Sequence, residues 1–586
     1  MPGKPPGGLP SERSASWVPW IVALAVLAVY GRALGRFFTS EDFLLVRFLD
    51  EHPPWRGLRS LFAAPWLDIS VVKFWRPVST LLYGVEIAAF GARPFGYNLT
   101  HVLVHALNAV LVWNIARRLD PGRFAPLAAA FLFALHPLHP NAVVFGASFA
   151  TLFAATFFLA AVLAWQREAR LLALGMFGLA LGSYEAAVVL PAVIVAWEIL
   201  LSRDRRRLVW TLPFFVLLAL YFLLRRSLFG VFVGGYEEQG RSLLAPQVGR
   251  LLRDLTMSIH QIHVPAWDRW PHPVAVGAVM ALVIGLPILL VAFGRSQTGW
   301  VRSWLFGWIW TLVCFAPFAF RPVVPGNGRY WYLASAGVAL SLAVLAREVW
   351  ESRGRWLAPA ALVLLGLFWG VLLQRHLTVS LQAGETARAI QGELVRTDAR
   401  FLTRHPDFLT NEIGTPIAGV LRYGVWDAVH PPFVEDAIEV LPLPPLSDSE
   451  FLPVYRGASG RRVHAWDSRA GKIREITPPQ DGPADIQVIA PAEGAVLDPG
   501  RDQLVVAVPS GAVRFRLIVV TRGNSTVIDL GPGTIQGGAL RASLPRDFCR
   551  SMDHLYGGEQ FWWIEARDGA GALVGFTPMR SFRVQP

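Results

Sequence analysis

The chain contains 586 residues, a length that accommodates two to four domains. Hydrophobic residues make up 53% of the sequence and charged residues only 16%, whereas soluble domains contain about 25% charged residues. The formal net charge of +12 rests almost entirely on arginine, because only three of the 54 basic residues are lysine. No basic groove with interleaved aromatic residues accompanies this charge. The composition excludes an ordinary soluble protein and argues against nucleic-acid binding.

Apolar runs of membrane-spanning length dominate the first two thirds of the chain. A helix needs about 20 mostly apolar residues to cross a bilayer. About eleven runs meet this condition: 17–36, 97–116, 124–138, 142–165, 171–184, 186–201, 208–224, 273–293, 300–318, 330–346 and 356–374. Residues 17–375 therefore predict a mainly α, polytopic membrane domain, preceded by a disordered cytoplasmic N-terminus at 1–16. Two connections, 37–96 and 225–272, are too long for simple turns and are predicted to be outer loops.

The arginines between these runs predict the orientation of the chain. If the N-terminus is cytoplasmic, the short inner loops carry 14 arginines and the short outer loops carry two. Short cytoplasmic loops are enriched in Lys and Arg, so this assignment is strongly favoured. An odd number of spans then places the C-terminus outside. We expect a multi-pass protein of the plasma (inner) membrane.

After Arg375 the chain becomes polar and its patterns change. Residues 376–480 mix helical and extended signals, which predicts an extracytoplasmic α/β linker domain. In residues 484–586, apolar side chains alternate along Phe515–Val519, and Asp568-Gly569 marks a hairpin turn. These features are typical of a β-sandwich of the fibronectin or immunoglobulin type.

Two adjacent carboxylates, Glu41 and Asp42, follow the first span on its outer side. Such a pair can provide a general base or bind a divalent metal ion. The alternative is a solvated helix start, because Ser40 is a favourable N-cap residue and acidic residues favour a first helical turn. Both interpretations stay open on local sequence alone.

Further polar residues lie at the predicted outer ends of the spans. His101, His105 and Asn108 share one helix face, because they are spaced at i, i+4 and i+7. Ionisable residues inside a membrane are functional by default, although two histidines do not make a metal site. His136 and His139 bracket a tight turn, where a structural role is equally plausible.

Taken in order, these motifs resemble a known family. They comprise the pair Glu41-Asp42, the turn Arg76-Pro77, a helix at 96–108, the segment 132–143, Tyr184-Glu185 and the segment 328–333. The ordered set is similar to the GT-C glycosyltransferases, and within them to the membrane half of the transmembrane-and-TPR protein O-mannosyltransferases and their bacterial relatives. The resemblance covers about residues 30–346. The last 210 or so residues lack the TPR array of that family.

Several positions depart from the family pattern. Asn98, Asn141, Phe149, Tyr184 and Gly328 stand where the family usually has His, Glu, Arg, Lys and Glu, respectively. The lost Lys and Arg fall near the phosphate site that the resemblance implies. A degenerate relative without activity is therefore an alternative.

The resemblance implies transfer of a sugar from a polyprenyl-phosphate donor to a protein or cell-envelope glycan on the outer face. The transfer would proceed by direct displacement with inversion. It implies catalytic roles for Asp42, as general base, and for its neighbour Glu41. The residues implied to bind the donor phosphate or substrate are Arg76, His105, His139, Glu185 and Arg329. No set of metal ligands is implied, and whether the protein uses a divalent metal ion as a cofactor stays open.

Two other classes of function compete with this interpretation. A transporter would also carry polar groups on several spans, but the sequence shows no inverted repeat. A non-catalytic membrane scaffold would bind partners through its outer β domain and would not depend on Asp42.

Overall fold

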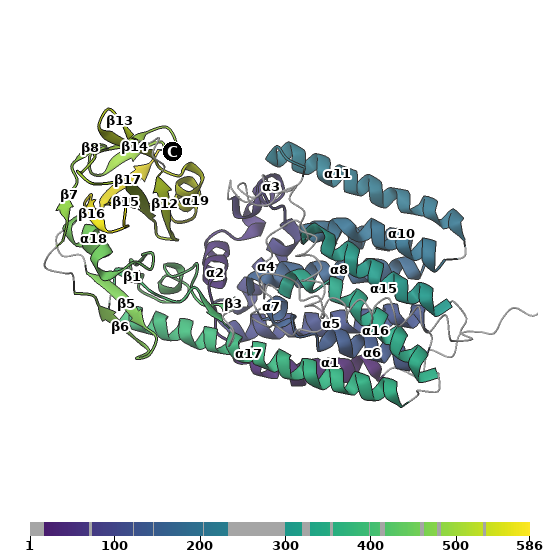
Figure 1. Cartoon of the computed structure of the whole chain (residues 1–586). Helices are drawn as coiled ribbons and strands as arrows, with labels where there is room; N and C mark the ends of the chain where they lie inside the picture. The colour runs from purple at the N-terminus through teal and green to yellow at the C-terminus, as the bar shows by residue number, and fades with distance from the viewer. Residues whose placement is uncertain are drawn as a thin grey trace, which may run out of the picture.

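The computed structural model describes residues 17–68, 73–120, 122–144, 146–202, 204–232, 299–318, 328–351, 356–397, 399–410, 416–457, 462–477, 482–530 and 535–585. The predicted tail 1–16, the predicted span 273–293 and most of the predicted loop 225–272 lie outside these residues. Helices form the chain up to Thr397, and strands dominate residues 399–585, which we call the C-terminal part (Figure 1).

Among the described residues, six helical segments are long and apolar enough to cross a bilayer. They are α1 with the 3-10 turn η2 (Val18–Gly35), α5 (Pro94–Leu119), α8 (Phe149–Gln166), η7 with α11 (Arg205–Phe229), α15 with η11 (Gly299–Phe318) and α17 (Leu357–Thr397). Other helices of the bundle are α4 (Pro77–Phe90), α6 (Phe124–Ala134), α9 (Arg170–Leu181), α10 (Leu190–Leu200) and α16 (Ala334–Glu351). The chain is an integral, multi-pass membrane protein, as predicted, while the count of eleven spans stays a prediction.

Close helix packing holds the bundle together. Helix α5 contacts α1, α6 and α8. Gly307 on α15 and Gly337 on α16 face each other, and a Cβ atom on either residue would collide with the backbone of the other helix. Small residues at such crossings let helices approach where lipid leaves little hydrophobic driving force. Large apolar side chains on other helices, such as Leu220 on α11 and Leu364 on α17, are exposed and suit contact with lipid.

Helix α17 is longer than its apolar run predicts. The sequence predicted a span at 356–374 followed by a linker domain from 376, but the helix continues to Thr397. Its 41 residues extend about 60 Å, twice the thickness of the hydrocarbon core. In Figure 1 the helix runs along the bundle and continues beyond it to strands β5 and β6.

The described residues also form short helices. They are α2 (Glu41–Glu51), α3 (Leu58–Ala63) and α7 (Pro140–Val143). Figure 1 shows α2 between the bundle and the C-terminal strands. We call this side of the bundle the α2 end.

The first sheet of the C-terminal part has the strand order β4-β1-β5-β6. Its strands are β1 (Phe401–Thr403), β4 (Leu441–Pro442), β5 (Val463–Asp467) and β6 (Lys472–Glu475). Strand β1 runs parallel to β4 and β5, and β5 and β6 form an antiparallel pair. Strands β2 (Phe408–Thr410) and β3 (Pro416–Gly419) form a separate antiparallel pair. Helix α18 (Leu452–Gly457) lies between β4 and β5 in the chain.

Two further sheets form the end of the chain. One has the order β13-β14-β10-β8, and the other has the order β12-β11-β15-β16-β7, with β17 and β9 joined through β15. Their strands are β7 (Ala484–Asp485), β8 (Val488–Ala490), β9 (Ala495–Leu497), β10 (Gln503–Ala507), β11 (Arg514–Val520), β12 (Ser525–Leu530), β13 (Ile535–Gln536), β14 (Ala539–Ser543), β15 (Gln560–Arg567), β16 (Leu573–Phe576) and β17 (Arg580–Val584). The strand-rich C-terminal region is confirmed. Helix α19 (Arg546–Tyr556) was not predicted, and the fibronectin-type topology stays a prediction.

Strands β11 and β15 bury side chains on both faces. Leu517 and Trp562 pack in the core shared with β10 and β14, whereas Ile518 and Trp563 pack against Phe401 and its neighbours in the first sheet. Successive strand residues point to opposite faces, which explains this division. The predicted linker domain and the predicted β-sandwich therefore share a hydrophobic core.

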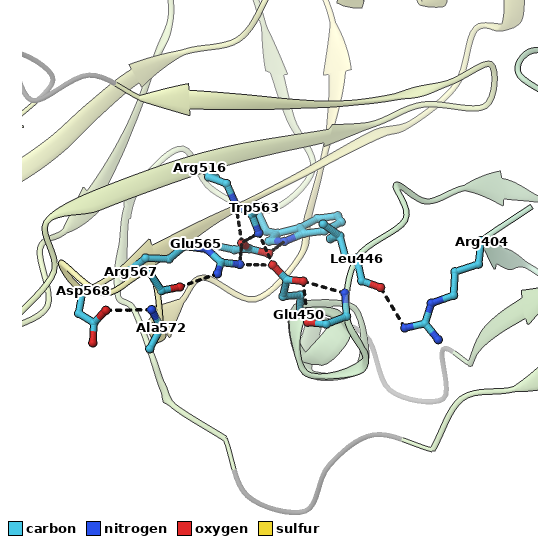
Figure 2. Close-up of polar contacts among 11 residues, drawn as sticks. Arg404, Leu446, Glu450, Arg516, Trp563, Glu565, Arg567, Asp568 and Ala572 are labelled. Carbon is cyan, nitrogen blue, oxygen red and sulfur yellow. Dashed lines mark hydrogen bonds and ion pairs between the residues drawn. The ribbon is translucent and has the colours of Figure 1, made fainter. Parts of the chain in front are cut away.

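A network of opposite charges joins the same two regions. Arg516 and Arg567 each contact both Glu450, from the 3-10 turn η14 (Asp448–Phe451) before α18, and Glu565, which is fully buried on β15 (Figure 2). Arg516 Nε donates to Glu565 Oε2 at 3.0 Å, and Arg567 Nη2 donates to the same atom at 3.1 Å. Two guanidinium groups thus balance two carboxylates.

The network predicts a pH-dependent stability. Burial, the largest contribution, raises the pKa of Glu450, but hydrogen bonds from Ser447 and the charges of Arg516 and Arg567 outweigh it, so the pKa lies below the ordinary 4.5. A lowered pKa stabilises the fold above the ordinary value, and this stabilisation is lost as the pH falls below 4.5. Glu450→Gln should therefore destabilise the protein at neutral pH by about 1–3 kcal/mol, the range for charged hydrogen bonds.

Thermal unfolding of the full chain in detergent, followed from neutral to acidic pH, measures this effect. The difference between Glu450→Gln and the wild type should shrink as the pH falls below 4.5. Glu475→Gln is the control, because its ion pair with Arg462 is solvent-exposed and contributes little. A difference that stays constant with pH would contradict the prediction.

Candidate active site

Residues 36–42, which we call the acidic loop, lead from the end of the first span into the first turn of α2 and contain the acidic pair. Asp42 is 1% exposed, and its Oδ2 accepts the Thr39 backbone N–H at 3.0 Å and the Arg36 Nη1 at 3.3 Å. Arg36 also donates to the Thr39 hydroxyl, which is 3.4 Å from the same carboxylate oxygen. The acidic pair does start a helix, as the alternative predicted, with Ser40 at the N-cap position but without a side-chain cap. The expected solvation is wrong for Asp42, which is buried. Asp42 is instead a buried carboxylate paired with an arginine.

Residues from α4 and from the turn before α8 surround this carboxylate. A Cβ atom on Gly146 would collide with Asp42 Oδ1 and would lie 3.3 Å from the Tyr83 hydroxyl. The Tyr83 ring stacks on Phe149, with ring centroids 4.2 Å apart. The sequence did not single out Arg36, Tyr83 or Gly146. Only the position of Arg36, between the first span and the acidic pair, offered a signal.

Burial shifts the pKa of Arg36. Its guanidinium is 4% exposed, and burial lowers the pKa, while the charge of Asp42 and the hydrogen bond to it act in the opposite direction. The pair therefore keeps two charges together away from solvent, which is costly unless both are well hydrogen-bonded.

The predicted donor-binding residues Arg76 and Glu185 form a direct ion pair. Arg76 Nε lies 3.1 Å from Glu185 Oε1, and Arg76 Nη2 lies 2.9 Å from Oε2. The guanidinium also lies over the rings of Phe74, Tyr184 and Trp66, at 4.2, 4.8 and 5.2 Å from the ring centroids. The pair is partly accessible, with 10% of the Arg76 side chain and 22% of the Glu185 side chain exposed.

Arg329 and Glu41 belong to the same neighbourhood. Arg329 lies in the 3-10 turn η12 (Gly328–Trp331), and its guanidinium is 5.3 Å from the Tyr330 ring centroid. Burial lowers the pKa of Arg329, but interactions with Tyr330, Tyr184 and Glu41 outweigh it and raise the pKa. Glu41 is partly exposed, so the two adjacent carboxylates occupy different environments.

His105 and His139 do not reach this neighbourhood. Both are 0% exposed, and their rings meet inside the bundle with centroids 5.1 Å apart. His105 Nδ1 is 2.7 Å from the Tyr332 hydroxyl, and His139 Nε2 is 2.8 Å from the Ser335 hydroxyl. Internal hydrogen bonds hold both histidines in the helix core, and their role in donor binding stays a prediction.

Four of the five departures from the family pattern have structural explanations, and Asn141 has none. Asn98 donates a hydrogen bond to the Arg36 carbonyl at 2.8 Å and so supports the acidic loop. Gly328 has no room for a side chain, because a Cβ atom there would collide with the Leu138 carbonyl. Phe149 supports Tyr83, and Tyr184 covers Arg76.

No group of three or more His, Cys, Asp or Glu side chains among the described residues is arranged to hold a metal ion. Glu41 and Asp42 are two carboxylates, so the metal alternative stays a prediction that rests on them alone.

A cavity of about 510 Å³ lies at the opposite end of the bundle from α2. Its lining includes Asp120, Trp300 and Arg347, from the end of α5, the start of α15 and α16. It contains none of the predicted site residues. We therefore place the candidate site at the α2 end, where the acidic pair lies and Glu41 interacts with Arg329.

Comparison with known proteins supports the resemblance in sequence. Protein O-mannosyl-transferase Tmtc1 of Drosophila melanogaster is 36% identical over 107 residues, which cover 18% of this chain and 12% of the relative. Tmtc2 of the same species is 32% identical over 148 residues (24% and 16%), and TMTC3 of Mus musculus is 27% identical over 153 residues (25% and 16%). The matches thus span less than a fifth of these relatives' length. No family model matches the chain.

Solved structures show weaker likeness. ArnT from Cupriavidus metallidurans, bound to undecaprenyl phosphate, is 15% identical with a TM-score of 0.36, over 77% of this chain and 93% of ArnT. The oligosaccharyltransferase AglB from Archaeoglobus fulgidus, in complex with an inhibitory peptide and a dolichol-phosphate, is 13% identical with a TM-score of 0.37, over 66% and 59%. Scores this low carry no argument about this chain. The similarity in sequence confirms the predicted resemblance to the protein O-mannosyltransferases.

Proposed function

We propose that the chain is a membrane glycosyltransferase of GT-C type that moves a sugar from a polyprenyl-phosphate donor to an acceptor on the outer face of the membrane. The observation that carries this proposal is the placement of Asp42. It is a buried carboxylate, oriented by Arg36 and Thr39. Its neighbour Glu41 interacts with Arg329, and Tyr184 joins Arg329 to the partly accessible pair of Arg76 and Glu185. The acceptor is a protein or a cell-envelope glycan.

Asp42 acts as the general base in this proposal. The acceptor hydroxyl oxygen attacks the anomeric carbon, the bond from that carbon to the phosphate oxygen breaks, and the hydroxyl proton passes to the carboxylate. Thr39 and Arg36 fix Oδ2 and thus the plane of the carboxylate. Glu41, the second proposed catalytic residue, interacts electrostatically with Arg329.

Arg76 and Arg329 stabilise the leaving lipid phosphate. Arginine suits this task because its planar guanidinium binds phosphate through two parallel hydrogen bonds. Glu185 contacts the Nε and Nη2 side of Arg76 and thereby orients the whole group. The aromatic rings around Arg76 exclude water, which strengthens electrostatic interactions at the site.

Replacement of Asp42 tests the base. Asp42→Asn keeps the size of the side chain but removes the proton acceptor, so sugar transfer should fall by about 10²-fold or more. Membranes supplied with a polyprenyl-phosphate sugar and an envelope extract as acceptor provide the assay. Asp120→Asn is the matched control, because Asp120 is also buried and lies 3.3 Å from an arginine, Arg347, at the opposite end of the bundle.

Normal transfer by Asp42→Asn, at matched protein level, would remove Asp42 from the mechanism and favour the scaffold or transporter alternatives. No transfer by the wild type with any donor would favour the degenerate alternative.

The role of Arg76 predicts a graded series. Arg76→Ala should lower transfer by about 10²-fold through lost charge stabilisation, and Arg76→Lys should recover only part of it, because lysine lacks the planar fork. Arg170→Ala is the control, since Arg170 also lies over an aromatic ring, Trp165, at 4.0 Å. Equal activity of the Lys and Ala variants would contradict the planar contact, and full activity of both would remove Arg76 from the site.

The proposed orientation has its own test. A reporter enzyme that works only outside the cytoplasm should be active when fused after Pro586 and silent when fused after Arg207. This result follows from the arginine-rich short loops on the predicted inner side. The reverse pattern would place Asp42 on the cytoplasmic side and refute the proposed outer-face reaction.

A further inference from the structure

We propose that residues 420–427 of the C-terminal part, which we call the clamp, hold the acidic loop in a strained conformation and thereby position Asp42. The positioning role rests on the function proposed above. The clamp is separated from the acidic loop by about 380 residues of sequence, and three independent contacts join the two.

The first contact is at Ser40, which adjoins the acidic pair. Ser40 has φ 47° and ψ −123°, a backbone conformation that only glycine adopts without strain. Its backbone N–H donates to the Val420 carbonyl at 2.7 Å, and its hydroxyl lies 3.4 Å from the Tyr423 backbone nitrogen. Strained residues persist only where surrounding structure enforces them. Here the two hydrogen-bonding contacts that reach Ser40 from a distant part of the chain both come from the clamp.

The second contact is the close approach of Gly424. This residue has φ +87°, and a Cβ atom on it would collide with the Ser40 carbonyl and lie 3.1 Å from the Phe43 side chain. Glycine is therefore required twice, by its backbone conformation and by the space beside the loop. Nearby, Phe433 packs edge-on against Phe43, with ring centroids 4.9 Å apart.

The third contact is a buried ion pair at the other end of the clamp. Arg47, on α2, donates from Nε to Asp427 Oδ1 at 2.5 Å, with the two side chains 3% and 0% exposed. Tyr556 donates to Asp427 Oδ2 at 3.0 Å, and Arg47 Nη2 donates to the Leu555 carbonyl at 3.1 Å. The Trp426 ring covers the guanidinium at 4.7 Å. Helix α19 thus stabilises the ion pair through Leu555 and Tyr556.

These contacts hold α2 on both sides of Asp42. One fixes the residue two positions before it, and the other fixes the residue five positions after it. Release of either contact lets Ser40 relax toward an ordinary conformation, which turns the start of α2 and moves Asp42 away from Thr39 and Arg36. The C-terminal part is therefore a structural component of the site. Gly424 and Asp427 are positioning residues, since neither touches the reacting atoms.

A pair of glycine substitutions in the full chain, purified in detergent, tests the clamp. Gly424→Ala introduces both backbone strain and a collision with Ser40, whereas the control Gly511→Ala introduces comparable strain at φ +82° with no atom within 4 Å. Amide hydrogen exchange of residues 37–48 should accelerate in Gly424→Ala and not in Gly511→Ala. Asp427→Asn, which weakens the contact with Arg47 at nearly constant size, should give an intermediate acceleration.

Transfer kinetics provide the second measurement. Gly424→Ala should lower kcat by about 10²-fold, the effect of misplacing a catalytic group by about 1 Å, while KM for the polyprenyl-phosphate sugar stays within about twofold. Unchanged exchange at 37–48 in both clamp variants overturns the clamp. Accelerated exchange with an unchanged kcat overturns its positioning role. If the wild type transfers no sugar, the proposed function fails, and the exchange comparison alone still decides whether the clamp holds the loop.

Discussion

A polar group inside hydrocarbon finds no water, so it must be satisfied by the protein itself, and the arrangement of this chain depends on that constraint. The backbone satisfies its N–H and C=O groups by forming helices. Buried polar side chains satisfy one another in pairs: Trp165 donates to Glu198 at 2.7 Å, and His105 lies 2.7 Å from the Tyr332 hydroxyl. His105, which the resemblance assigns to donor binding, thereby also joins two segments of the bundle.

The same constraint governs the charges at the α2 end. Three buried or partly buried carboxylates there each have a guanidinium partner: Arg36 for Asp42, Arg76 for Glu185 and Arg47 for Asp427. The charges within these three pairs are therefore balanced before any substrate arrives. A phosphate that enters must compete with Glu185 for Arg76 or share it. Such a site favours a ligand that brings a large charge and many acceptor oxygens, rather than a single weak acceptor.

The sequence predicted the elements whose signal is local. Apolar runs located the helices of the bundle, and alternation located strands such as β11, because both patterns follow from burial of one face. It did not predict the second half of α17, whose residues are polar although they stay helical. It also did not predict the burial of Asp42. That burial depends on Gly146, about a hundred residues away, and on a clamp near residue 424, and no local pattern encodes such contacts. The sequence also did not predict that Tyr332 and Ser335, distant in the sequence, complete the hydrogen bonds of His105 and His139.

The continuity of α17 makes the thickness of the bilayer part of the mechanics of this protein. A single helix of 41 residues connects the membrane-spanning bundle to the C-terminal strands, so a tilt of its first half also moves its second half. Membranes differ in hydrocarbon thickness by several ångströms, and spans adjust to this mismatch by tilting. A tilt of about 10° displaces a point about 30 Å along a helix by about 5 Å. A displacement of that size exceeds the reach of any hydrogen bond, so lipid composition sets the mechanical load on the contacts between the bundle and the strands.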